Sequence, residues 1–136
     1  MITADSSVWI DYLGGRLTPA ATALDAVLDD SSHDVVLLDV VLMEVLRGFR
    51  HDREWQLAQA ALLGLPVVTA GGQSVALRAF NLYRSLRQGG VTVRSSVDLL
   101  VGAWCIENDC TLIHSDRDFV PMQSNGLQVW GHNPRD

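Results

Sequence analysis

Four acidic residues lie where an α/β fold would bring carboxylates together. They are Asp5, Glu44, Asp98 and Asp116. The first follows a short apolar run at residues 2–4, and the last comes just after a similar run at 111–113. In a parallel α/β sheet the carboxyl ends of the strands share one edge, and ligands bind there. The other two acids lie in apolar helical stretches between these runs. If all four meet, they form a pocket of carboxylates that suits a hard cation such as Mg²⁺ or Mn²⁺.

Three of these acids also admit a purely structural role. Asp is among the preferred residues before a helix, so Asp5 could cap the helix that follows it. Ser95 and Asp98 have the spacing of a capping box, and the helix dipole favours an acid in the first turn. Asp116 could cap a short helix at 117–122. Each of these three acids therefore fits a helix cap as well as a ligand.

Glu44 has no such explanation. It lies inside the apolar stretch 40–46, and a helix that is apolar all round is expected to be buried. A lone buried carboxylate is costly and takes up a proton unless it is paired or bound to a metal. A salt bridge to Arg47, three residues later, is the structural alternative. We therefore expect Glu44 to face inward and to belong to a metal site.

The composition predicts one globular domain spanning residues 1–136. Hydrophobic residues make up 48% of the chain, which is too many for a disordered protein. No apolar run reaches the length of about 20 residues that a membrane span needs, and no signal peptide is apparent, so we expect a cytoplasmic protein without membrane contact. Cys105 and Cys110 do not share a helical face and are expected to be reduced packing residues. The net charge of −6 argues against binding nucleic acid by broad basic attraction, but it is compatible with a metal nuclease.

Strand and helix signals alternate along the chain. Strands are predicted at 2–5, 34–38, 65–69, 111–114 and 127–130. Helices are predicted at 6–12, 19–30, 39–49 with Asp39 as its cap, 53–63, 73–86 and 95–108, with a short one after Asp116. Such alternation indicates βαβ units. The expected fold class is therefore α/β, with a central, mainly parallel sheet flanked by helices.

The acids lie in four short motifs. These are Ala4-Asp5-Ser6-Ser7, Met43-Glu44-Val45-Leu46-Arg47-Gly48, Val97-Asp98-Leu99-Leu100-Val101-Gly102-Ala103 and His114-Ser115-Asp116-Arg117-Asp118-Phe119. Over nearly the whole chain this pattern resembles the PIN-domain nucleases, and most closely the VapC toxins of type II toxin–antitoxin modules. The D-R-D-F stretch is the most specific part. The sequence departs from the usual pattern at residues 94–96, where apolar residues are more common, so substrate contacts are expected to differ there.

The resemblance implies a function and assigns roles to the residues. It implies an endoribonuclease that hydrolyses RNA phosphodiester bonds with Mg²⁺ or Mn²⁺, held by Asp5, Glu44, Asp98 and Asp116 as metal and catalytic residues. Asp118 matches a position that holds metal or water in some members, and Ser7 matches a hydroxyl residue that orients the first acid. The resemblance also implies a homodimer and a cognate VapB-like antitoxin.

Other interpretations remain open from the residues alone. Arg47, Arg50 and Arg53 recur every three positions and could contact RNA, contact the antitoxin or simply be solvated. A catalytically silent PIN-like module that binds RNA or protein is the alternative function, although such modules usually lack one acid. A phospho-accepting receiver domain needs a lysine, and the sequence has none. No G-x-G-x-x-G motif follows the first strand, which excludes a dinucleotide-binding domain.

Overall fold

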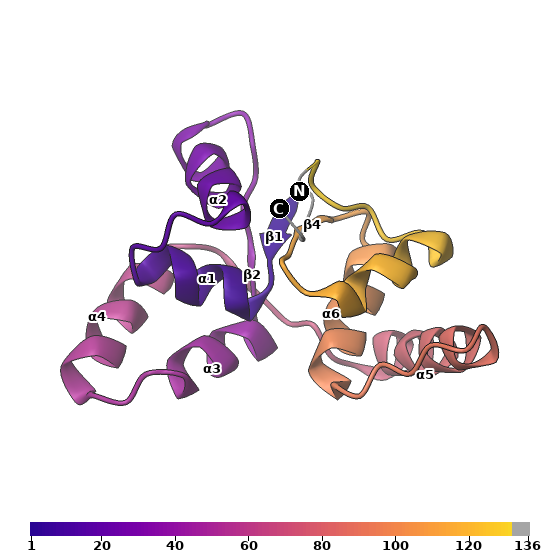
Figure 1. Ribbon diagram of the computed structural model, residues 1–136. Coiled ribbons are helices and arrows are strands. Elements are labelled where there is room, and N and C mark those ends of the chain that lie inside the picture. Colours follow the sequence, from indigo (N-terminus) through magenta and orange to yellow (C-terminus); the bar gives the residue numbers. More distant parts are fainter. Residues whose placement is uncertain (132–136) are drawn as a thin grey trace.

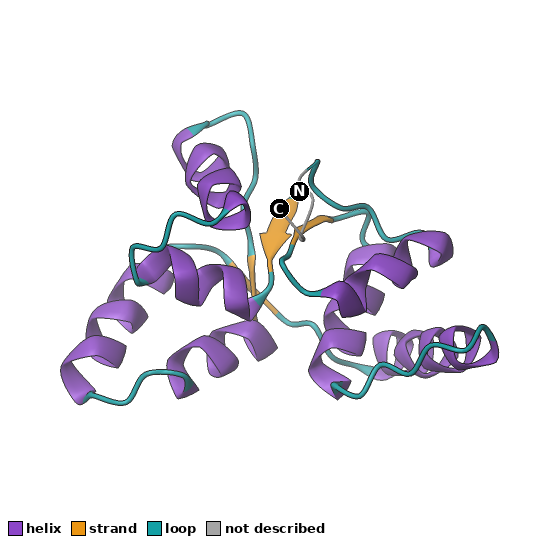
Figure 2. Cartoon of the chain, viewed as in Figure 1, coloured by secondary structure: helices purple, strands orange, loops and turns teal. Residues whose placement is uncertain are grey.

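A parallel sheet runs through the middle of the molecule, and helices flank it (Figure 1). The computed structural model describes residues 1–131. Its elements are β1 (Ile2–Ala4), α1 (Ser6–Leu13), α2 (Pro19–Asp29), β2 (Leu37–Leu38), α3 (Asp39–Arg47), α4 (Asp52–Leu62), β3 (Val67–Val68), α5 (Gln73–Gln88), α6 (Ser96–Glu107), β4 (Thr111–Ile113) and the 3₁₀ helix η1 (Arg117–Asn125). Figure 2 shows α1 to α4 on one side of the strands, with α5, α6 and η1 on the other.

All the strands run in the same direction. β1 pairs with β4, so that Ala4 lies opposite Ile113, and β2 pairs with β3. A bridge between Ile2 and Val35 joins the two pairs, and a second bridge adds Val129 to the free side of β4. The order across the sheet is therefore β3, β2, β1, β4 and the segment around Val129. This confirms the predicted α/β class and places the carboxyl ends of β1 and β4 side by side.

The outer strands are shorter than the sequence indicated. Only Val67 and Val68 of the predicted strand 65–69 are in regular pairing, and the predicted strand 127–130 is reduced to one bridge at Val129. Both lie at sheet edges, where there is a partner on one side only. Pro66 also lacks a backbone N–H, and proline is confined to edges or to strand starts. Edge position and proline therefore account for the missing length.

Asp39 is not the cap that the sequence predicted. Helix α3 begins at Asp39 itself, and the preceding Leu38 occupies the cap position without a side-chain hydrogen bond. The Asp39 carboxylate accepts hydrogen bonds from the backbone N–H of Val40 at 2.8 Å and of Ala70 at 3.0 Å. It therefore fastens the start of α3 to the segment that leads into α5.

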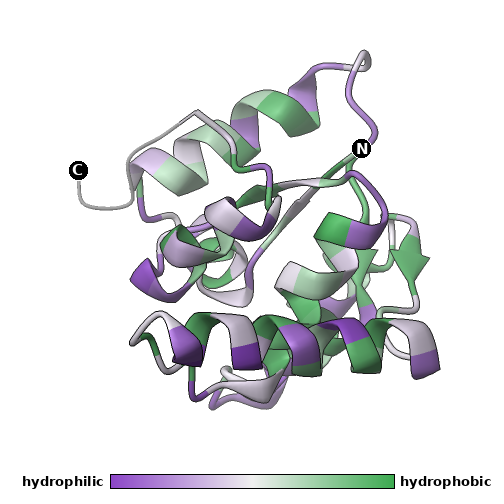
Figure 3. Cartoon of the chain, turned by 90° about the vertical axis from the view of Figure 1, so that its right-hand side faces the viewer, coloured by the Kyte–Doolittle hydropathy of each residue, from purple (hydrophilic) through white to green (hydrophobic). Residues whose placement is uncertain are grey.

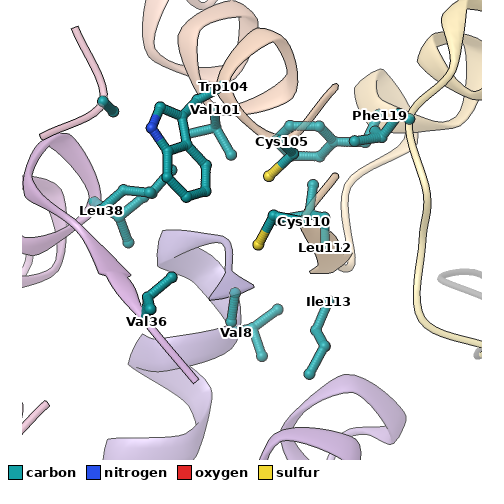
Figure 4. Close-up of a cluster of buried hydrophobic side chains, with 14 of the residues drawn as sticks. Val8, Val36, Leu38, Val101, Trp104, Cys105, Cys110, Leu112, Ile113 and Phe119 are labelled. Carbon is teal, nitrogen blue, oxygen red and sulfur yellow. The ribbon is translucent and has the colours of Figure 1, made fainter. Parts of the chain in front are cut away.

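The core is built around the β1–β4 pair and helix α6. Figure 4 shows Trp104 and Cys105 of α6 next to Cys110 and the β4 side chains. Cys105 and Cys110 are both free and buried. The hydrogen bond with Cys110, together with burial, raises the pKa of Cys105 well above its ordinary value. This holds its thiol protonated, as expected of a packing residue. None of the helices in the described part of the chain has the length and apolarity needed to cross a membrane.

Candidate metal site at the carboxyl edge of the sheet

Asp5 lies directly after β1 and is almost completely buried, with 4% of its surface exposed. It caps α1, since Oδ1 accepts a hydrogen bond from the backbone N–H of Ser6 at 2.6 Å. Oδ2 accepts one from the Ser7 hydroxyl at 2.8 Å. Burial raises the pKa of Asp5, and the charges of Asp116 and Glu44 raise it further, while the two hydrogen bonds act in the opposite direction. Asp5 therefore combines the cap role with a place beside two other acids.

Ser7 connects Asp5 to the other strand. Its hydroxyl oxygen lies 3.2 Å from that of Ser115, which follows β4. Ser7 thus contacts both the acid that follows β1 and the serine that follows β4. Ser115 was not singled out from the sequence, because a serine next to a strand end gives no signal of its own; only the pairing of β1 with β4 reveals its position.

Asp116 and Asp118 lie where β4 leads into η1. Asp116 occupies the cap position of η1 and accepts a hydrogen bond from the backbone N–H of Asp118 at 2.9 Å. Both side chains are half-buried. The predicted cap of a short helix is thus present, although the helix is a 3₁₀ helix that runs on to Asn125. The turn places two carboxylates, two residues apart, on the same side of the chain.

Asp98 enters the site from the first turn of α6. Ser95 caps this helix by accepting a hydrogen bond from the backbone N–H of Asp98 at 3.2 Å. Among the described residues, the Asp98 carboxylate accepts no hydrogen bond from the backbone N–H of Ser95, so only half of the predicted capping box forms. The pKa of Asp98 is raised to about 7. Burial is the largest cause, and the charges of Asp5, Asp116, Glu44 and Asp118 add to it. The carboxylate of Asp98 is thus held among like charges.

Three of these carboxylates are close enough to share one cation. Asp98, Asp116 and Asp118 each offer an oxygen, and these oxygens all lie within 4.8 Å of one another. The donors are oxygen only, as Mg²⁺ and Mn²⁺ prefer. Mutual repulsion also raises the pKa of Asp98, and a bound cation would favour the ionised forms. The residues present therefore fit a divalent metal ion, with Asp118 closer to the centre than the sequence pattern indicated.

Glu44 is near the site but is not buried as predicted. Its side chain is half-exposed, and Met43 beside it is 48% exposed. The prediction was wrong because α3 buries only Val41 and Val45, while its other side faces solvent. No ion pair within 4.0 Å joins Glu44 to Arg47 among the residues described, so the structural alternative is absent as well. The charge of Glu44 nevertheless acts on Asp5 and on Asp98, which places it beside the acid cluster.

The three regularly spaced arginines do not form one helical row. Arg47 ends α3, Arg50 lies in the connection, and Arg53 is in the first turn of α4. All three are exposed. The break between α3 and α4 separates them, and none of them belongs to the acid cluster.

The sequence is similar to that of known nuclease-family proteins over most of its length. A family profile described as PIN domain matches residues 2–123. "VapC ribonuclease Mb1587" of Mycobacterium bovis is 29% identical over 119 residues, which cover 88% of this chain and 89% of the relative. "Ribonuclease VapC11" of Mycobacterium tuberculosis matches with the same identity and coverage.

Solved structures share the fold at low sequence identity. VapBC2 from Rickettsia felis, bound to a DNA fragment from its promoter, superposes with a TM-score of 0.76 at 16% identity, covering 96% of this chain and 98% of that chain. VapBC from Salmonella typhimurium, also bound to DNA, gives a TM-score of 0.75 at 14% identity, with the same coverage of both chains.

Proposed function

The chain belongs to the PIN-domain family, and on this premise we propose that it is a VapC-type toxin: an endoribonuclease that needs Mg²⁺ or Mn²⁺ and is neutralised by a cognate antitoxin. Support comes from the two mycobacterial relatives, which are named as VapC ribonucleases and match most of the chain. The chemistry is argued from the group of carboxylates, and the partner from an apolar groove.

The observation that carries the proposal is the group of carboxylates at the sheet edge. Asp98, Asp116 and Asp118 bring their oxygens within 4.8 Å of one another, and the charges of Asp5 and Glu44 act on the same group. So many acids at one point destabilise the fold unless a cation offsets them. A site that is costly for the fold and rich in oxygen ligands is typical of metal-dependent phosphodiester hydrolysis.

Each residue has a role in this proposal. Asp98, Asp116 and Asp118 hold the ion, and Asp5 and Glu44 complete the acidic pocket. The ion would supply a Lewis acid for the phosphate and would lower the pKa of water. Ser7 and the Ser6 backbone fix the carboxylate of Asp5. Because Asp5 has 4% of its surface exposed, its orientation is set before any substrate arrives.

The antitoxin is proposed as the partner of a separate surface. A groove of about 250 Å³ lies between the end of α1 and the start of α4, and its apolar lining includes Leu13, Phe49 and Leu57. Leu57 is 63% exposed, which favours a covering partner. An amphipathic antitoxin helix would fill such a groove. We propose that a second copy of the chain is also bound, forming a homodimer.

The direct test is cleavage of RNA by the purified chain. With Mg²⁺ or Mn²⁺ we expect cleavage of cellular RNA, and with a chelator we expect none. Asp116→Asn should lose nearly all activity while keeping its melting temperature. Asp109→Asn is the matched control, because Asp109 is an exposed acid outside the site whose backbone φ of 50° asparagine also tolerates. Mapping 5′ ends of cellular RNA after expression of the chain and of Asp5→Ala would identify the substrate.

The alternative function, a silent RNA- or protein-binding module, gives a different result. Such a module would bind no Mn²⁺ at the site in calorimetry and would leave RNA intact. If Asp116→Asn cut RNA as fast as the parent chain, the assignment of the site would be wrong, even if the chain proved to be a nuclease.

A further inference from the structure

The charges of this acidic protein are unevenly distributed. Residues 55–97 contain no acidic residue and carry Arg78, Arg84, Arg87 and Arg94, while all 16 acids lie outside this stretch. The stretch includes the whole of α5. The protein as a whole has a net charge of −6, but this stretch has a positive charge. A local positive charge on an acidic protein favours an anionic partner.

The outward face of α5 combines Arg84 and Arg87 with exposed apolar side chains. The helix buries Val75, Ala79, Leu82 and Leu86 against the core. On the opposite side Leu77 and Phe80 are each 55% exposed. Figure 3 views the molecule from this side, with hydrophilic and hydrophobic residues alternating along α5. A surface that mixes aromatic and cationic groups has both contacts that single-stranded nucleic acid uses, base stacking and phosphate binding.

In the described part of the chain, Arg78 has an acidic partner, Glu107 at 4.0 Å, but the other three arginines of this stretch have none. The guanidinium of Arg84 lies over the ring of Phe80, 5.8 Å from its centroid. Arg87 donates a hydrogen bond to the Tyr83 hydroxyl at 3.1 Å. Among the described residues, no ion pair within 4.0 Å involves Arg84, Arg87 or Arg94. Their charges are therefore held in place by neutral groups and remain available to an anion.

A small polar cavity adjoins the same helix. Its volume is about 240 Å³, and it is lined by Arg78, Asn81, Leu82, Ser85, Ile106 and Asn125. Asn81, Ser85 and Asn125 offer donors and acceptors beside the apolar Leu82 and Ile106, and Ser85 and Asn125 lie 3.5 Å apart, within hydrogen-bond distance of each other. This combination suits the edge and face of a nucleobase, because bases need hydrogen bonds along one side and apolar contact on the other.

The basic surface and the acid cluster belong to one helical pair. Ser74 at the start of α5 donates a hydrogen bond to Glu107 at the end of α6, so the two helices run antiparallel. The connection from Gly89 to Ser95 then leads into the first turn of α6, where Arg94 precedes Asp98 by four positions. A nucleic-acid strand bound at the acid cluster can thus extend along Arg94 and the arginines of α5.

We propose that the outward face of α5, with Arg94, binds the part of the RNA substrate that flanks the cleaved bond. This rests on the proposed ribonuclease function. RNA fits this face better than a second copy of the chain does. In a symmetric dimer through this face, each helix would meet itself. Arg84 and Arg87 would then oppose their own counterparts without any acid to offset them.

The test measures RNA binding apart from cleavage. Fluorescence anisotropy with a short labelled single-stranded RNA, in a chelator, would report the affinity of the full chain and its variants. Arg84→Gln should weaken binding by about fivefold and lower the salt slope by about 0.7. Arg16→Gln is the matched control, because Arg16 is exposed and paired with Asp11 at 3.7 Å. The control should bind as the parent does.

Cleavage and sedimentation separate the remaining outcomes. With Mn²⁺, Arg84→Gln should raise KM and leave kcat unchanged. Equal effects of Arg84→Gln and Arg16→Gln, parental binding by the Arg84→Gln/Arg87→Gln variant, or no RNA binding by the parent would each overturn the proposal. The proposal would also fail if the Arg84→Gln/Arg87→Gln variant bound RNA as the parent does but sedimented with a different oligomeric state. That result would assign the face to contact with a second copy of the chain. If the parent cuts RNA and only the α5 effects are absent, this inference fails and the proposed function stands.

Discussion

The hydroxyl oxygens of Ser7 and Ser115 lie 3.2 Å apart, although 108 positions separate them in the sequence. Ser7 donates its single hydroxyl proton to Asp5 at 2.8 Å. The proton between the two hydroxyls must therefore come from Ser115. Ser115 after β4 thus holds Ser7 in place, and Ser7 in turn holds the Asp5 carboxylate after β1.

This pair predicts that Ser115 is a positioning residue. Ser115→Ala should lower kcat for RNA cleavage by about tenfold, because Ser7 loses the donor that orients it toward Asp5. Ser115→Thr keeps a hydroxyl and should restore most of the rate. The measurement is kcat at saturating RNA and Mn²⁺, with the melting temperature as a check on folding. A parental kcat for Ser115→Ala would show that the contact is incidental.

Asp118 is predicted to be a metal ligand. Its carboxylate joins those of Asp98 and Asp116 within 4.8 Å, so Asp118→Asn replaces one of three charged groups with a neutral amide, which is a weaker ligand. The affinity for Mn²⁺ should fall by about 10- to 100-fold in calorimetry. Asp109→Asn removes the same charge outside the site and should bind Mn²⁺ as the parent does. Equal affinities for the two variants would exclude Asp118 from the metal site.

The metal-free protein should lose stability as the pH rises toward neutrality. The pKa of Asp98 is raised from 3.8 to about 7 in the folded chain. Between these values the folded chain keeps a proton that the unfolded chain has lost, so the free energy of unfolding falls with rising pH and levels off above about 7. In a chelator, the melting temperature should therefore decrease across this window.

Asp98→Asn supplies the control for that titration. It removes the ionisable group, so its melting temperature in a chelator should exceed that of the parent at a pH above the titration and should vary less with pH. Saturating Mn²⁺ should flatten the parental profile, since the ion favours the charged forms. A parental melting temperature that stays constant from acid to neutral pH would contradict the assignment of this loss of stability to the ionisation of Asp98.

Gly102 is predicted to be required for the packing of α6. A Cβ at this position would lie 2.5 Å from the sulfur of Met122, whose side chain is fully buried in η1. Gly102→Ala should therefore cost about 1–3 kcal/mol in urea denaturation, despite the better helix propensity of alanine. Gly71→Ala adds the same methyl group where nothing lies within 4 Å, and it should be nearly neutral. Similar losses for both variants would point to a backbone effect instead.

The sequence predicted the parts of the fold that depend on local pattern. The alternation of apolar strands and capped helices predicted the parallel sheet and every helix, because each signal lies within a few residues. The strand lengths at the sheet edges were overestimated, since pairing depends on neighbours that are distant in sequence. The role of Asp39 was misjudged for the same reason: its carboxylate binds the backbone of Ala70, 31 positions away.

The site shows a similar division. Asp5, Asp98 and Asp116 stand at element ends, as the pattern indicated. Asp5 and Asp116 also make the cap contacts that the structural alternative required, whereas Asp98 only donates its backbone N–H to the Ser95 cap. The apolar neighbours of Glu44 in the sequence predicted that it is buried. Composition alone, however, does not show how many sides of a helix pack against the rest of the protein. Ser115 gave no signal, because its importance arises only from the register of β1 against β4.

The central position of β1 also determines when the molecule can assemble. β1 precedes the other elements of this chain, yet its neighbours in the sheet are the segment around Val35 and, much later, β4. A growing chain must therefore leave one side of this apolar strand unpaired until the last third of the sequence has emerged. Asp98, Asp116 and Asp118 belong to that same final third. The acid cluster therefore cannot be complete until β4 and the turn after it have emerged, and a ribosome that stalls before β4 would release a chain that lacks Asp116 and Asp118.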